Sequence, residues 1–183
     1  NPFLGNRALR LCLDMPDMFR TQLRAALRAS AFGPMQIMFP MVGTIDDVRA
    51  GNAAVEAVKA ELRAEGIPFD EKIKVGIMIE IPSIAMIADL AAKETDFASV
   101  GTNDLTQYLH AVDRMNPKLN TYYQSSSPAM FRILGKIFKE YNEANKQVSV
   151  CGELAGEPLA AIVLFGLGLR KFSMNASNIA HVK

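Results

Sequence analysis

The sequence predicts an α/β protein of the (β/α)8 TIM-barrel type, of which it contains only the later βα units. Short apolar or β-branched runs alternate with longer helical patterns, as in parallel sheets with right-handed crossovers. Polar side chains recur at the carboxyl ends of successive predicted strands, where such a barrel has its active site. No glycine-rich phosphate-binding fingerprint follows any predicted strand, so the alternative, an open doubly wound sheet, lacks its usual signal.

The chain has 183 residues, a length typical of one domain with a sizeable core. Five predicted strands cannot close an eight-stranded barrel, which needs about 250 residues. The sequence also opens with NPFLGNRALR and no methionine. We therefore expect residues 1–183 to be a fragment of a barrel whose first units are absent, and we expect its first strand to expose an edge suited to association.

Apolar and β-branched runs predict five strands. The second, KVGIMIE, is continuously apolar, which favours burial on both faces. The predicted strands are residues 35–41, 74–80, 97–101, 147–153 and 171–177.

Helical spacing and capping signals predict the helices between these strands. Thr44 and Asp47 form a capping-box pattern before a helix that ends at Gly66. Proline suits the first turn of a helix, and three predicted helices begin at one. The helices are predicted at residues 18–31 and 44–66, and from Pro82, Pro128 and Pro158, the last ending near Gly168.

Composition and charge exclude several classes of function. With 20 basic and 19 acidic residues and no long basic run interleaved with aromatics, nucleic acid is not expected as the main partner. No apolar segment of roughly 18 residues and no leader pattern occurs, so we expect neither membrane spanning nor secretion. The two cysteines, Cys12 and Cys151, lack metal-type spacing, which indicates a reducing cytoplasm rather than a disulfide framework.

Two carboxylates stand at the ends of neighbouring predicted strands. Glu80 ends the second strand, and Asp104 follows the third, directly after Asn103. Two carboxylates beside an amide suit Mg²⁺, which takes one or two carboxylates and completes its shell with water and substrate oxygens. The alternative is that each acid only stabilises the N-terminus of the following helix. For the pair, the metal site is the favoured interpretation.

Arginines and one cysteine complete the candidate site. Arg7 and Arg114 could bind an anion with bidentate geometry, although Arg114 alone would suggest a surface ion pair with Asp113. Cys151 ends the fourth strand beside Gly152, where a thiol can exchange a proton or serve as a small buried apolar group. Spacing alone does not decide between these. The remaining candidates, interpreted as packed or solvated side chains, are Cys12, Arg10, His110 and His181, with a site-lining role for His110 as the less favoured alternative.

Taken together, these motifs resemble a known family. The segments NPFLGNRALR, IMFPM, GIMIEIP, SVGTNDLTQY, AVDR and VCGELAGEP occur in this order. The whole chain resembles the phosphoenolpyruvate-binding barrel of enzyme I of the bacterial sugar phosphotransferase system. Pyruvate phosphate dikinase and phosphoenolpyruvate synthase share the GTND and NP-x-LG-x-R elements, but CGELAG together with AVDR is more similar to enzyme I.

The resemblance implies roles for individual residues. Glu80 and Asp104 would hold Mg²⁺, and Asn103, Arg7 and Arg114 would contact phosphoenolpyruvate. The resemblance also implies that Cys151 protonates the enolate carbon as pyruvate forms.

The resemblance also implies partners and limits. Enzyme I acts in the cytoplasm, dimerises through this barrel, and passes its phosphoryl group to the phosphocarrier protein HPr. The family's phosphate-accepting histidine, in a TSH-type motif, is absent here, as are the strands that bring two further arginines. We therefore do not expect this chain alone to complete the transfer. Two alternatives stay open: a fragment of a synthase or dikinase, or a catalytically silent module for dimerisation or ligand sensing.

Overall fold

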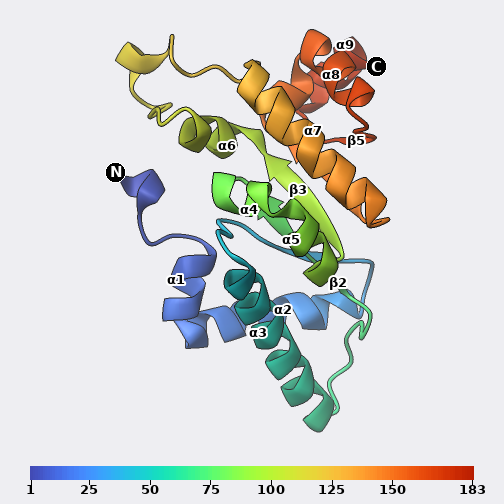
Figure 1. Ribbon diagram of the computed structural model, residues 1–183. Helices are drawn as coiled ribbons and strands as arrows, with labels where there is room; N and C mark the ends of the chain where they lie inside the picture. Colours follow the sequence, from blue (N-terminus) through green and yellow to red (C-terminus); the bar gives the residue numbers. More distant parts are fainter.

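The computed structural model describes residues 1–183 as a five-stranded, fully parallel sheet with helices packed along it (Figure 1). The strands lie side by side in chain order, which leaves the first and last as edges. This arrangement confirms the predicted α/β fold of partial-barrel type. The strands are β1 (Gln36–Phe39), β2 (Lys74–Ile79), β3 (Phe97–Gly101), β4 (Gln147–Cys151) and β5 (Lys171–Phe172).

The helices begin where the sequence signals them. Thr44 Oγ1 accepts a hydrogen bond from the Asp47 N–H, and the Asp47 carboxylate accepts one from the Thr44 N–H, which confirms the capping box. The α-helices are α1 (Leu9–Asp14), α2 (Pro16–Ser30), α3 (Ile45–Ala64), α4 (Pro82–Met86), α5 (Ala88–Glu94), α6 (Thr102–Leu109), α7 (Pro128–Glu143), α8 (Pro158–Gly166) and α9 (Ala176–Val182). Three short 3₁₀ turns are η1 (Pro2–Leu4), η2 (Pro117–Leu119) and η3 (Glu153–Gly156).

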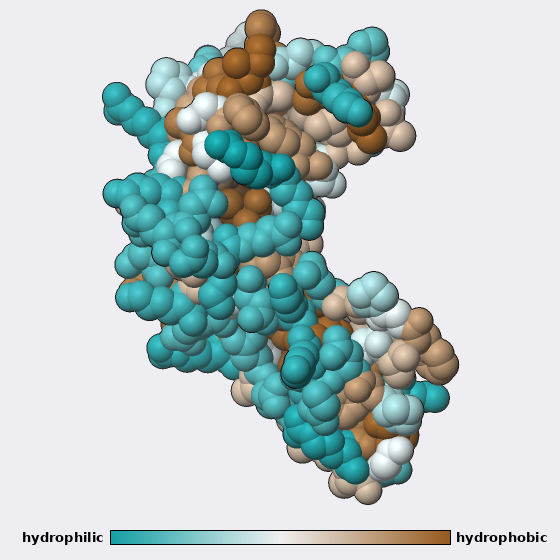
Figure 2. All heavy atoms as spheres, turned by 90° about the vertical axis from the view of Figure 1, so that its right-hand side faces the viewer, coloured by the Kyte–Doolittle hydropathy of each residue, from teal (hydrophilic) through white to brown (hydrophobic).

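The core lies between the sheet and the helices. Ile77 and Ile79 of β2 are fully buried there, whereas Met78, on the opposite face of the strand, is only half-buried. The prediction that β2 is buried on both faces was therefore only partly right. Figure 2 shows a crescent-shaped outline, hollowed on one side.

Three segments differ from their predicted structure. A separate short helix, α1, precedes α2, and the helix that starts at Pro82 is broken at Ile87, whose backbone leaves the helical region (φ −113°, ψ 34°). The strand predicted over 171–177 ends at Phe172, because the chain turns at Asn175 to begin α9. No helix is both long enough and apolar enough to cross a bilayer.

Candidate functional site

The predicted site residues gather at the carboxyl ends of β2, β3 and β4. Glu80 follows β2, Asp104 lies in the first turn of α6, and Cys151 ends β4. The parallel register pairs Ile79 with Val100 and Gly101 with Cys151, so the strand ends are level. The sheet therefore brings residues that are far apart in the chain to one edge.

Glu80 is a buried carboxylate, 4% exposed, and its Oε1 accepts a hydrogen bond of 2.7 Å from the Met41 N–H. Its Oε2 lies where a side chain at Gly101 would begin: a Cβ there would be 2.8 Å from that oxygen. Burial, together with the nearby negative charge of Asp104, raises the pKa of Glu80 to about 7. Glycine at position 101 thus leaves the space that the carboxylate occupies.

Asp104 lies between two guanidinium groups. Its Oδ2 is 3.6 Å from Arg7 Nη2, and its Oδ1 is 3.1 Å from Arg114 Nη2. Asp104 is 7% exposed, and both arginines are partly buried. Arg114 therefore pairs with Asp104, whereas the Asp113 carboxylate accepts a hydrogen bond from the Met115 N–H instead. The surface ion pair considered for Arg114 and Asp113 is not formed.

Phe3 lies against both arginines, a contact that the sequence did not reveal. Its ring centroid is 5.8 Å from Arg7 Cζ and 5.3 Å from Arg114 Cζ, within the range of cation–π attraction. The Tyr108 hydroxyl donates a hydrogen bond to the Phe3 carbonyl, which ties the N-terminal turn to α6 (Figure 1). In the sequence, the one signal for this contact was the position of an aromatic residue, Phe3, four residues before Arg7.

Two hydrogen bonds from other loops fix Asn103. Its side-chain Oδ1 accepts from the Glu153 N–H at 3.2 Å, and its main-chain carbonyl accepts from the Tyr123 hydroxyl at 3.1 Å. Because the side-chain oxygen is already bonded to an N–H group, the amide offers its NH₂ group to a ligand. The orientation of Asn103 therefore suits a donor to a substrate oxygen.

Cys151 is half-buried at the end of β4, and its thiol lies 3.5 Å from the Val100 carbonyl, to which it donates. It lines a cavity of about 580 Å³ together with Asn103 and Asn175. Gly152 follows with φ +106°, and a Cβ there would collide with Thr102 and Asn103, so only glycine fits. Cys151 therefore contacts open space, whereas Cys12 packs against the hydrophobic core.

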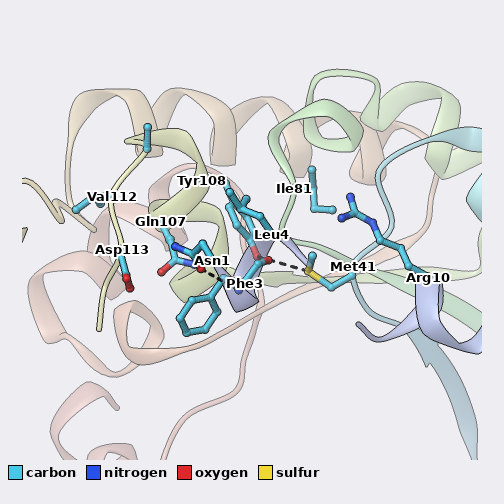
Figure 3. A pocket seen from close by; sticks show the side chains of 11 residues that line it. Asn1, Phe3, Leu4, Arg10, Met41, Ile81, Gln107, Tyr108, Val112 and Asp113 are labelled. Carbon is cyan, nitrogen blue, oxygen red and sulfur yellow. Dashed lines mark hydrogen bonds between the residues drawn. The ribbon is translucent and has the colours of Figure 1, made fainter. Parts of the chain in front are cut away.

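The histidines and Arg10 are not part of this cluster. His110 Nδ1 is 3.0 Å from the Thr106 carbonyl, and its Nε2 is 2.9 Å from Ser127 Oγ, so both ring nitrogens have partners. This agrees with a packed histidine. Arg10 does not pair with Asp104 but lines a neighbouring cavity of about 370 Å³, which Phe3 also lines (Figure 3).

Three buried polar atoms around the cluster make no hydrogen bond within the chain: Arg7 Nη1, Asp104 Oδ1 and Gln107 Nε2. The 3.1 Å ion pair at Asp104 Oδ1 lacks hydrogen-bond alignment. Each such atom costs about 1–3 kcal/mol unless a ligand meets it. The two donors, Arg7 Nη1 and Gln107 Nε2, suit a bound anion, and the carboxylate oxygen of Asp104 suits a cation beside it.

The side chains available as metal ligands indicate which kind of metal the site suits. Glu80 and Asp104 supply carboxylate oxygens, and no cluster of three or more His, Cys, Asp or Glu side chains that could hold a metal occurs in the chain. A soft or tetrahedral metal would need more such ligands, whereas Mg²⁺ needs only one or two carboxylates plus water and substrate oxygens. The residues present fit Mg²⁺.

Comparison with solved structures identifies the fold. A citrate lyase from Burkholderia xenovorans LB400 matches with a TM-score of 0.65 and 21% identity, over 89% of this chain and 52% of that one. An aldolase/citrate lyase family protein from Burkholderia cenocepacia J2315 matches with a TM-score of 0.61 and 17% identity, over 86% of this chain and 63% of that one. These similarities support the partial-barrel fold.

Comparison of sequences identifies the family. Proteins named phosphoenolpyruvate-protein phosphotransferase are 54% identical in Priestia megaterium, 50% in Staphylococcus carnosus and 48% in Bacillus subtilis, each over 98% of this chain. The chain spans 31% of the length of these relatives. All of residues 1–183 match the family described as PEP-utilising enzyme, PEP-binding domain. The chain therefore belongs to the PEP-binding domain family of PEP-utilising enzymes, which confirms the resemblance found in its sequence.

Proposed function

We propose that this chain binds phosphoenolpyruvate together with Mg²⁺, as the substrate-binding part of a phosphoenolpyruvate-protein phosphotransferase. The observation that carries the proposal is the buried pair Glu80 and Asp104 beside two arginines, with polar atoms on Arg7 and Asp104 that lack hydrogen bonds. The names of the relatives support the same function. Because these relatives are about three times as long, the complete transfer is proposed for the whole enzyme only.

Glu80 and Asp104 would hold the metal. When bound, Mg²⁺ neutralises charge on the phosphoryl and carboxylate oxygens of the substrate. Binding of a cation requires both carboxylates to be ionised, so it favours loss of the proton that burial keeps on Glu80 near neutral pH.

Arg7, Arg114 and Asn103 would bind and orient the anion. Phosphoryl transfer depends mainly on positioning and on stabilisation of negative charge. Arg7 Nη1 is a buried donor without a partner, and the NH₂ group of Asn103 is available because its oxygen accepts from the Glu153 N–H. Both groups would donate to oxygens of the bound substrate.

Cys151 would supply the proton that completes pyruvate. When the bond between phosphorus and the bridging oxygen breaks, its electron pair stays on the three-carbon unit as an enolate, whose methylene carbon then takes one proton. The Cys151 thiol lies level with the carboxylates and lines an open cavity. In the reverse direction the thiolate removes a methyl proton from pyruvate.

The whole enzyme would need further parts. Its phosphoryl acceptor would be a histidine in another domain, which would pass the group on to the phosphocarrier protein HPr. The whole enzyme would be a homodimer and would act in the cytoplasm. A fragment of a synthase or dikinase is the alternative, but the relatives named above, at 48–54% identity, support the phosphotransferase.

Exchange of the pyruvate methyl protons tests the proposal. In D₂O with Mg²⁺, the purified protein should exchange these protons faster than buffer, as followed by NMR. Cys151→Ser should remove most of the exchange, whereas Cys12→Ser, a matched control away from the site, should keep it. Equal rates in the Cys151→Ser variant and the unmodified protein would exclude the proton role of Cys151, and exchange independent of Mg²⁺ would contradict the metal site.

A further inference from the structure

Gln107 is a buried amide next to the proposed site, and no role has yet been assigned to it. It lies on α6 three residues after Asp104, which places both on one face of the helix. It is 4% exposed, and its Oε1 accepts a hydrogen bond of 3.0 Å from the Arg114 N–H. This bond determines the orientation of the amide, because a main-chain N–H can only donate.

The other end of the amide has no partner. Gln107 Nε2 is buried and makes no hydrogen bond within the chain. Burying an amide donor in this way is unfavourable, and a ligand acceptor would remove the cost. Since the NH₂ group can only donate, it suits an anionic or carbonyl oxygen and cannot bind the metal.

The surroundings of Gln107 indicate which ligand its NH₂ group would contact. Gln107 and Phe3 line the same cavity of about 370 Å³ (Figure 3). The Phe3 ring contacts both guanidinium groups that flank Asp104. Gln107 therefore lies beside Phe3 and the main chain of Arg114, close to the arginines to which the proposed substrate would present its negatively charged oxygens.

We propose that Gln107 is a further substrate-binding residue with two functions. Its Nε2 donates to an anionic oxygen of phosphoenolpyruvate held by Arg7 and Arg114, and its Oε1 holds the main chain of Arg114 in place. The inference rests on the proposed function and deepens it by adding a second neutral donor, besides Asn103, to the two charged ones.

Two substitutions separate the functions. Gln107→Glu keeps an acceptor for the Arg114 N–H but replaces the donor by a negative charge, whereas Gln107→Met removes both hydrogen bonds. Calorimetric titration with phosphoenolpyruvate and Mg²⁺ should show a dissociation constant at least about tenfold higher for both variants, since a lost hydrogen bond to a charged group costs about 1.5–3 kcal/mol. Gln147→Glu, an exposed position at the start of β4, is the matched control and should bind like the unmodified protein.

The possible outcomes are distinct. Normal binding by Gln107→Glu with weak binding by Gln107→Met would mean that the residue only holds Arg114, and it would overturn the donor role. Weak binding by Gln107→Glu with normal binding by Gln107→Met would indicate remote charge repulsion and would also overturn it. If the unmodified protein does not bind phosphoenolpyruvate, the proposed function itself fails. Thermal unfolding of each variant checks that the fold is kept.

Discussion

Glu80 should destabilise the metal-free protein at neutral and alkaline pH, and Glu80→Gln should relieve this. Burial raises the pKa of Glu80 from its ordinary value of 4.5 to about 7, so folding favours the protonated carboxyl. The stability that this group contributes is present below pH 4.5 and is lost as the pH rises through about 7. A glutamine is neutral at every pH, and its oxygen can still accept from the Met41 N–H.

The size of the effect follows from the two pKa values. At about 1.4 kcal/mol per pH unit, the difference between the two pKa values lowers the free energy of unfolding by about 3 kcal/mol at pH 8. At pH 5 the same group lowers it by less than about 1 kcal/mol. Glu80→Gln should therefore raise the free energy of unfolding by roughly 2–3 kcal/mol at pH 8 and by under about 1 kcal/mol at pH 5.

Urea unfolding at both pH values, in the presence of EDTA, measures this difference. Glu143→Gln, at an exposed position near the end of α7, is the matched control and should show no such pH dependence. A variant Glu80→Gln that is less stable than the unmodified protein at pH 8, or that differs from it equally at both pH values, would refute the reasoning. Added Mg²⁺ should stabilise the unmodified protein but not this variant.

Two other substitutions test how the site is built. Gly101→Ala places a Cβ 2.8 Å from Glu80 Oε2. Calorimetry should show weaker Mg²⁺ binding, and urea unfolding should show that the free energy of unfolding falls by about 1–3 kcal/mol. Unchanged metal affinity would mean that the Glu80 carboxylate is not a ligand. Phe3→Leu removes two cation–π contacts of about 0.5–1 kcal/mol each and should raise the dissociation constant for phosphoenolpyruvate about five- to thirtyfold in the same titration. Unchanged affinity in Phe3→Leu would show that its ring does not position Arg7 and Arg114.

The features predictable from the sequence were those set by local patterns. The positions of four strands, the capping box at Thr44 and the proline-initiated helices follow from spacing and capping over a few residues. The clustering of Glu80, Asp104 and Cys151 was also predictable, because parallel strands place their carboxyl ends at one edge.

The features that could not be predicted depend on contacts between distant segments. Phe3 packs on Arg114, and Gln107 accepts from the Arg114 main chain, only because the N-terminal turn and the loop after α6 fold back on that helix. The break at Ile87 and the early end of β5 likewise have no local proline or glycine signal. Sequence periodicity carries no information on such contacts.

The most direct test of the proposed site is calorimetric titration of the purified protein with phosphoenolpyruvate, with and without Mg²⁺. Binding should require Mg²⁺ and should be lost in Asp104→Asn, which keeps the shape of the side chain but removes the charge, while Asp17→Asn, at an exposed position on α2, should bind normally. Binding that does not need Mg²⁺, or that persists unchanged in Asp104→Asn, would contradict the account.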